Sequence, residues 1–193
     1  MRPFFSRRIG LLEGREVPID VGGKVNGRVR GTNFGALAVR TRDVRGLAPA
    51  ATMSVMRVKQ NVLRESSVGF IATAGDPLDR GRSWLLGPDL IYQTSRFRGD
   101  KNFLVGVWGL AMDRGDLTGQ KSAFGFKIDY PNDLWDIAFT HKSLGNAFLP
   151  SLGFVPRPEC GSRTSTSTTA PGRGGPSPGY ASGRCSTSSS TRS

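Results

Sequence analysis

The sequence predicts an all-β fold: an antiparallel meander of eight or nine long strands in residues 1–155, followed by a disordered tail at 156–193. Two observations carry this prediction. Short segments of the first region alternate apolar with polar residues, and Gly, Asp, Asn and Pro separate them without a sustained helical period. Beyond residue 155, Ser, Thr, Gly, Pro and Arg dominate, and they bury too little apolar surface to offset the entropy cost of ordering.

Eight segments alternate well enough to count as strands, and a short segment at 8–12 makes a ninth. The segment at 17–25, for example, has valine and isoleucine on one face and Asp20 and Lys24 on the other. In chain order, the expected strands are 8–12, 17–25, 33–41, 52–60, 67–73, 83–94, 103–108, 124–130 and 135–142.

Short links allow every neighbouring pair to be antiparallel. Arg98-Gly99-Asp100 and Arg114-Gly115-Asp116 interrupt the alternation where turns are needed, and residues 131–133 make a third link. The two Arg-Gly-Asp triplets also match an integrin-type adhesion motif. Gly-Asp turns between strands are common, so we interpret both triplets as turns.

Three details favour part of a transmembrane β-barrel over a soluble β-protein, since both alternate. The clean segments span about 9 to 12 residues, as a tilted bilayer crossing requires, whereas globular strands have about 5 or 6. Trp84 and Tyr92 are eight positions apart, about 20 Å in height at a tilt of about 40°, which is near the height of an outer-membrane apolar band. The faces opposite the apolar stripes carry charged and small polar residues, as the water-filled interior of a barrel does.

Two details oppose the barrel. Pro88 interrupts one of the best strands, where a closed sheet has no free edge to accommodate a missing N–H. The segment at 52–60 has apolar residues on both faces. A soluble antiparallel sheet therefore stays open as the alternative.

The candidate site consists of two sets of residues. Aromatic residues near the ends of the apolar stripes predict a girdle at the membrane surface: Trp84, Tyr92, Tyr130 and Trp135. Charged residues on the opposite faces predict a polar lining: Asp20, Lys24, Lys121, Lys127, Asp129, Asp136 and Lys142. Such a lining would plug or tune a pore with a weak preference for anions. An ion-paired or solvated lining without transport is an equal alternative.

No known catalytic or nucleotide-binding motif occurs in the sequence, so we expect neither an enzyme nor a cofactor or metal site. His141 lies on an apolar stripe and is expected to be a structural histidine at the membrane interface rather than a general base. Asp76 and Asp79 occupy a glycine-containing link, which we interpret as a solvated loop rather than as a pair of catalytic or calcium-binding carboxylates.

The formal net charge of +12 initially suggests nucleic-acid binding. That function needs basic residues clustered on one face with stacking aromatic residues. Instead, the tail at 156–193 has five arginines and one glutamate, and the other basic residues are spread over turns and polar faces. Basic loops also suit the phosphates of lipopolysaccharide.

Five motifs occur here in the order in which one bacterial family has them. They are SRRIGL at 6–11, GGKVNGRV at 22–29, FGALAVRT at 34–41, VMRVKQNVLRESSVGFIAT at 55–73 and FLPSLGFVPR at 148–157. The chain resembles an interior stretch of the C-terminal domain of this family. Its members are outer-membrane proteins of unknown function, with a family 9-like carbohydrate-binding module at the N-terminus and a β-barrel-like domain at the C-terminus.

The resemblance implies a location in the bacterial outer membrane. It also implies an export signal and a carbohydrate-binding module that this chain does not contain, so we expect a fragment; no signal peptide is visible. The relatives continue with further strands after the last motif. A frameshift near Pro158 would explain the Ser/Thr-rich tail, and a natural low-complexity tail explains it equally well.

The function expected from these observations is a non-catalytic membrane anchor or pore of a surface carbohydrate-binding protein. Membrane lipid is the expected partner, with lipopolysaccharide as a second candidate and carbohydrate only through the missing module. The alternative is a soluble basic β-protein that binds a polyanion such as nucleic acid.

Overall fold

The computed structural model has no α-helix among the residues that it describes, and its fold is all-β. It describes residues 2–6, 9–12, 14–131, 135–155 and 163–171, with the backbone alone for 135–136 and 163–171. The strands are β1 Leu11–Leu12, β2 Arg15–Glu16, β3 Ile19–Val29, β4 Thr32–Thr41, β5 Thr52–Val62, β6 Ser66–Ala74, β7 Ser83–Phe97, β8 Lys101–Arg114, β9 Ser122–Pro131, β10 Trp135–Leu144 and β11 Arg163–Pro171.

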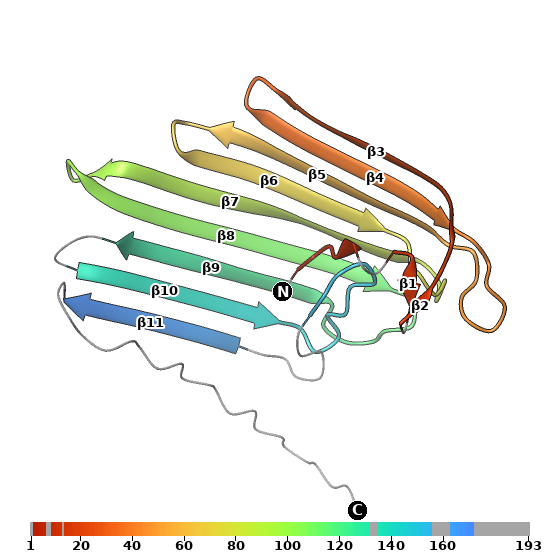
Figure 1. The fold of residues 1–193 in the computed structure, drawn as a ribbon. Coiled ribbons are helices and arrows are strands. Elements are labelled where there is room, and N and C mark those ends of the chain that lie inside the picture. The colour runs from red at the N-terminus through yellow and green to blue at the C-terminus, as the bar shows by residue number, and fades with distance from the viewer. Residues whose placement is uncertain (1, 7–8, 13, 132–134, 156–162, 172–193) are drawn as a thin grey trace, which may run out of the picture.

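Strands β3 to β11 form a single sheet in which each strand is hydrogen-bonded to its neighbours in the chain (Figure 1). Every pair is antiparallel, which confirms the predicted meander. The two edges of the sheet are β3 and β11, which do not pair with each other. These strands have 9 to 15 residues, well above the usual globular length of about 5 or 6.

The ninth strand of the sheet is not the one that the sequence predicts. Of the expected strand at 8–12, the structure describes residues 9–12; among these only Leu11–Leu12 is a strand, and it pairs with Arg15–Glu16 as a small separate hairpin. The ninth strand is β11, within the tail that we expected to be disordered, so that expectation does not hold for Arg163–Pro171. Four of these nine residues are threonine, a β-branched residue that favours strands, and β10 offers a free edge. Residues 156–162 and 172–193 lie outside the described part of the chain.

The two ends of the sheet have connections of very different length (Figure 1). At one end, which we call the turn end, the described connections have two or three residues: 30–31, 63–65 and 98–100. At the other end, the loop end, they have seven to ten residues: 42–51, 75–82 and 115–121. The expected link at 98–100 is therefore a turn and that at 114–116 opens a loop, whereas 132–133 of the third link lie outside the described residues.

Pro88 lies inside β7 without shifting its register. Leu86 pairs with Ala111 and Asp89 with Trp108, while the two residues between them, Gly87 and Pro88, form no ladder pair with β8. A Cβ atom at Gly87 would collide with the carbonyl oxygen of Gly109, so glycine permits a close backbone approach here. The missing N–H of Pro88 thus leaves a local gap in the hydrogen bonding between β7 and β8 but does not interrupt the strand.

A small hydrophobic core lies at the loop end, under the segment 145–155, which we call the cap. Phe148 of the cap packs against buried side chains from four strands, and all of these point to the same side of the sheet: Ile71, Leu85, Leu110, Met112 and Ala123. Met53 of β5 is buried on this side too, at 1% exposure. The mixed pattern at 52–60 follows from this arrangement, because Met53 packs into the core on one side of the sheet, whereas Met56 lies on the other side at 44% exposure.

Candidate functional site

One side of the sheet is an exposed apolar surface, which we call the apolar face. The registers place alternate residues of β3 to β10 on this side, and fourteen of them are large hydrophobic residues with at least 36% exposure. They are Val21, Val25, Val29, Phe34, Met56, Val68, Phe70, Leu86, Leu90, Tyr92, Val107, Phe124, Ile128 and Ile137. Burying a large apolar side chain is worth about 1.5–3 kcal/mol, so this face favours contact with lipid or another apolar surface.

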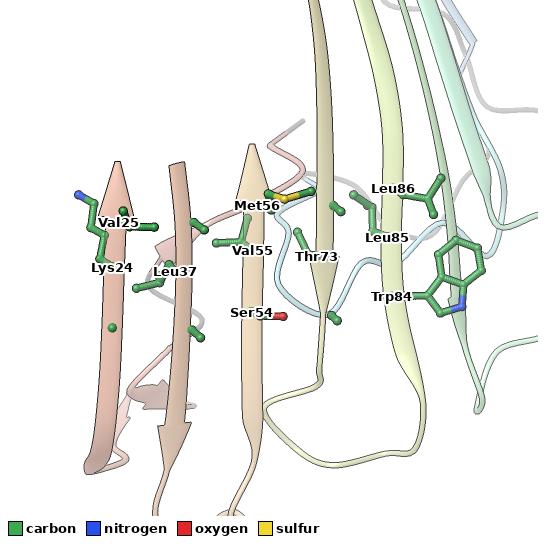
Figure 2. A pocket seen from close by; sticks show the side chains of 15 residues that line it. Lys24, Val25, Leu37, Ser54, Val55, Met56, Thr73, Trp84, Leu85 and Leu86 are labelled. Carbon is green, nitrogen blue, oxygen red and sulfur yellow. The ribbon is translucent and has the colours of Figure 1, made fainter. Parts of the chain in front are cut away.

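The opposite side, the polar face, carries charged residues. The alternation is visible in Figure 2, where Val25, Met56 and Leu86 point one way and Lys24, Val55 and Leu85 the other. This face holds most of the predicted lining that the structure describes: Lys24, Lys127, Asp129 and Lys142. Lys127 and Asp129 lie toward the turn end, whereas Lys142 lies two residues before the loop end of β10. Lys127 donates a hydrogen bond from Nζ to Asp129 at 2.6 Å, so two of the four pair with each other.

The structure places two further predicted lining residues at the loop end. A β-bulge between Ile19 and Val21 breaks the alternation of β3, and Asp20 within it forms a 2.6 Å ion pair with Arg42. Lys121 lies in the loop before β9 and pairs with Asp113 at 2.5 Å. Neither residue therefore joins the four on the polar face. The side chain of Asp136 lies outside the described part of the structure.

A cross-strand ion pair on the polar face was missed by sequence reasoning. Arg57 of β5 reaches across Gly69 of β6 to Asp89 of β7, and a Cβ atom at Gly69 would collide with both side chains. The signal is present in the sequence, since all three positions fall on the polar face once the strands are in register. Without the register, Arg57 and Asp89 are too far apart in the chain to suggest contact.

Of the predicted girdle, three members lie on the apolar face. Trp84 is near the loop end of β7, whereas Tyr92 of β7 and Tyr130 of β9 lie toward the turn end. Phe97, the last residue of β7, lies beside Tyr130 at the turn end. Its ring stacks on that of Phe103 with 4.9 Å between the centroids and meets the ring of Tyr130 edge-on at 6.3 Å. The side chain of Trp135 lies outside the described residues.

His141 lies on the apolar face of β10 among aromatic side chains. Its ring centroid is 5.6 Å from that of Phe126 and 6.1 Å from that of Phe124. A polar hollow of about 320 Å³ adjoins it near the loop end, lined by Ser122 and Ser143 among others. The imidazole of His141 thus contacts aromatic rings on one side and a polar hollow on the other, a position that suits its amphipathic ring.

The polar face contains a recess of about 690 Å³ between the cap and the turn end. Trp108 lies over Gly125, where a Cβ atom would collide with its indole ring, and Gly87 and Gly106 also line the recess. The charged residues around it are Arg57, Asp89, Lys127 and Lys142. Arg57 is paired with Asp89 and Lys127 with Asp129, so Lys142 alone adds a positive charge outside the described ion pairs, and it weakly favours negatively charged solutes.

A second hollow of about 680 Å³ lies on the apolar face across β3 to β7 (Figure 2). Small residues form its floor: Gly23, Ala36, Ala38, Ser54, Ala72 and Ala74. Larger side chains such as Met56, Trp84 and Leu86 border it.

At the loop end, polar contacts fasten the cap to the sheet. Asp76 is buried at 3% exposure and accepts hydrogen bonds from Ser151 Oγ at 2.7 Å, from the Leu78 amide at 2.8 Å and from Arg80. Ser83 and Ser151 share a 2.8 Å hydrogen bond between their hydroxyls. The interpretation of this link as a solvated loop is thus wrong for Asp76, because the cap covers it.

Arg114 provides another contact between the cap and the sheet. It is buried, and its Nη1 donates to the carbonyl oxygen of Leu149 at 3.1 Å. Its Nε donates to Asp116 Oδ1 at 2.5 Å, and this hydrogen bond lowers the pKa of Asp116 below its usual value. Ionised Asp116 therefore helps to hold the guanidinium that anchors the cap.

Within the described ranges, no three His, Cys, Asp or Glu residues are placed to hold a metal ion. No helix in this part of the chain is long and apolar enough to cross a membrane. Comparisons with family models, with curated proteins and with solved structures found no match for this chain.

Proposed function

We propose that this chain is part of an outer-membrane β-barrel domain that acts as a non-catalytic anchor or pore. The observation that carries the proposal is the apolar face, with fourteen exposed large hydrophobic residues. Barrels of this class have an apolar outer surface and a polar interior, and their strands alternate accordingly. The polar face with Lys24, Lys127, Asp129 and Lys142 would then form the lumen.

The dimensions and connections support the same proposal. A strand of ten residues, such as β4 or β9, extends about 33 Å, or about 25 Å in height at a tilt of about 40°, which equals the apolar band of such barrels. Outer-membrane barrels have short turns on the periplasmic side and longer loops outside. The turn end and the loop end would accordingly face the periplasm and the cell exterior.

The polar face supports an anchor at the loop end and a solute path at the turn end. The cap covers the loop end of the polar face with a packed core, which would plug a lumen. Between the cap and the turn end, the recess contains Lys142 outside the described ion pairs, which weakly favours anions. In a longer protein of the family that the chain resembles, such a domain would hold a carbohydrate-binding module at the cell surface.

The second candidate function is a soluble basic β-protein that binds a polyanion such as nucleic acid. The free edges β3 and β11 favour it, because unpaired edges are not tolerated in contact with lipid. The charge of +12 also favours it. In that protein the apolar face would have to be covered by a partner or a second copy.

Detergent dependence tests the proposal. The full chain is refolded with and without dodecylmaltoside micelles, and far-UV circular dichroism, size-exclusion chromatography and urea unfolding are measured. We expect strand signal with cooperative unfolding only in micelles. A monomer that unfolds cooperatively without detergent would overturn the proposal, and steeply salt-dependent binding to an oligonucleotide would then support the second function.

A further inference from the structure

Each fully described turn at the turn end contains an exposed arginine. Arg30 lies in the turn between β3 and β4, Arg64 between β5 and β6, and Arg98 between β7 and β8. Arg28 and Arg96 lie within two residues of these turns and are exposed as well. We call these five arginines the turn rim: Arg28, Arg30, Arg64, Arg96 and Arg98.

No residue of the turn rim forms an ion pair within the described part of the chain. The acids nearby have other contacts, since Glu65 accepts a hydrogen bond from Ser95 at 2.6 Å and Asp100 lies 3.5 Å from Lys101. The loop end differs, because four basic residues there pair with aspartates. The guanidinium groups of the turn rim are thus available for an external anion.

The turn rim also borders apolar and aromatic side chains. Leu63 lies at the tip of its turn with 81% exposure. Phe97 stacks on Phe103, and the guanidinium of Arg98 lies 6.0 Å from the centroid of the Phe97 ring. Aromatic and basic side chains together at the border of an apolar band are typical of the membrane–water interface.

We infer that the turn rim binds the phosphate groups of anionic phospholipids in the leaflet that surrounds the turn end. This inference rests on the proposed function. A planar guanidinium donates two parallel hydrogen bonds to a phosphate, and it keeps its charge at any physiological pH. The apolar face begins directly beside the turn rim, so headgroups at this height would meet the arginines while their acyl chains contact Val29, Phe97 and Phe103.

The regular spacing of the arginines favours a lipid leaflet over a compact ligand. The turns belong to three successive hairpins of the sheet and are spread along one of its ends (Figure 1). Their arginines are therefore spread along this end too. A layer of headgroups can meet all of them together. Each basic residue near an anionic membrane surface strengthens binding by about fivefold at moderate ionic strength.

The test compares phosphatidylcholine vesicles with vesicles that also contain phosphatidylglycerol. The full chain is refolded from urea in the presence of each, and the partition coefficient is measured by flotation at low and high salt. The test variant is R30Q/R64Q/R98Q, and the matched control is R15Q/R45Q/R82Q, which removes three exposed, unpaired arginines of the described loop end. A third variant, R30K/R64K/R98K, keeps the charge.

We expect phosphatidylglycerol to raise the partition coefficient of the wild type at least tenfold at low salt. The R30Q/R64Q/R98Q variant should lose most of this increase, while R15Q/R45Q/R82Q keeps it and the lysine variant recovers a large part. The inference is overturned if R30Q/R64Q/R98Q retains the full increase, or if the loop-end control loses as much. It is also overturned if polyglutamate or free glycerol phosphate binds the turn rim in preference to vesicles, since the ligand would then be an acidic protein or a small phosphate.

Failure of the proposed function gives a different result. A chain that folds without partitioning into any vesicle contradicts the membrane proposal itself. A chain that partitions into phosphatidylcholine alone, with no further increase from phosphatidylglycerol, contradicts only the lipid specificity of the turn rim. Far-UV circular dichroism of each floated sample shows whether the variant has folded.

Discussion

At the turn end of the sheet, five arginines in or beside the tight turns form no ion pair among the described residues, whereas at the loop end four ion pairs accompany long connections. The loop end also has the hydrophobic core, in which Phe148 and Leu152 are almost fully buried. The loop end thus holds itself together through side-chain packing. The turn end has few such contacts, and its arginines are available to bind groups outside the chain.

This difference teaches how one sheet can meet two environments. In the proposed barrel, the apolar face between the ends would contact lipid, and at each end the chain would return to water. At the loop end, the cap and its partners Asp76 and Arg114 cover the polar face. At the turn end, the connections have only two or three residues and are too short to form a cover over the sheet.

The largest expected effect comes from removing the core of the loop end. Phe148 is 2% exposed, so Phe148→Ala should lower the free energy of unfolding by about 3–5 kcal/mol through a cavity and lost burial. Urea unfolding in micelles measures it. The matched control is Phe124→Ala on the apolar face, which is 53% exposed and leaves no cavity in the core; it should cost less, about 1–2 kcal/mol from lost contact with the micelle. Equal losses would mean that the cap does not stabilise the loop end.

The next effect concerns the apolar band between the ends. Leu90, in the middle of β7 on the apolar face, is 44% exposed. Leu90→Arg should destabilise the chain in phosphatidylcholine vesicles by about 2–4 kcal/mol, because the charge would lie near the bilayer midplane. Asn26→Arg on the polar face is the control and should be almost neutral. Similar costs for both, measured by urea unfolding in vesicles, would contradict a lipid-facing surface.

The alternation of residues predicts the long strands, their order and most of the two faces. Lys24 and Lys127 can be placed on the polar face, and Tyr92 on the apolar face, because side chains alternate with a period of two. The exposed apolar residues follow from the same rule. These features depend on neighbours in the chain, which is why the sequence contains them.

Other features depend on contacts between distant segments. The burial of Asp76 requires Ser151, which lies 75 positions later, and the pairing of Arg57 with Asp89 requires the register of three strands. The bulge that redirects Asp20 is a local irregularity of the backbone that alternation does not report. The turn rim was overlooked for a related reason, because its arginines gather only when all three turns fall at the same end.

A smaller effect should follow from removing the carboxylate that fastens the cap. Asp76→Ala deletes the acceptor of Ser151, Arg80 and the Leu78 amide, and it should lower the free energy of unfolding by about 2 kcal/mol. Asp100→Ala at the turn end is the control, since the side chain of Asp100 is 83% exposed. We expect the control to stay within about 0.5 kcal/mol of the wild type. A cost as large at Asp100 would remove the distinction between the two ends.

The smallest expected effect is a pH dependence confined to the loop end. The hydrogen bond from Arg114 lowers the pKa of Asp116 in the folded chain, so this contact stabilises the fold fully above the ordinary carboxyl pKa of about 4. The stabilisation is lost as the pH falls below that value and through the lowered pKa. The difference in urea midpoint between the wild type and Asp116→Asn should therefore shrink between about pH 5 and pH 2. Asp43→Asn, an exposed loop-end substitution outside the described ion pairs, controls for the loss of a carboxylate. A difference for Asp116→Asn that stays constant with pH would mean that ionised Asp116 does not secure Arg114 under the cap.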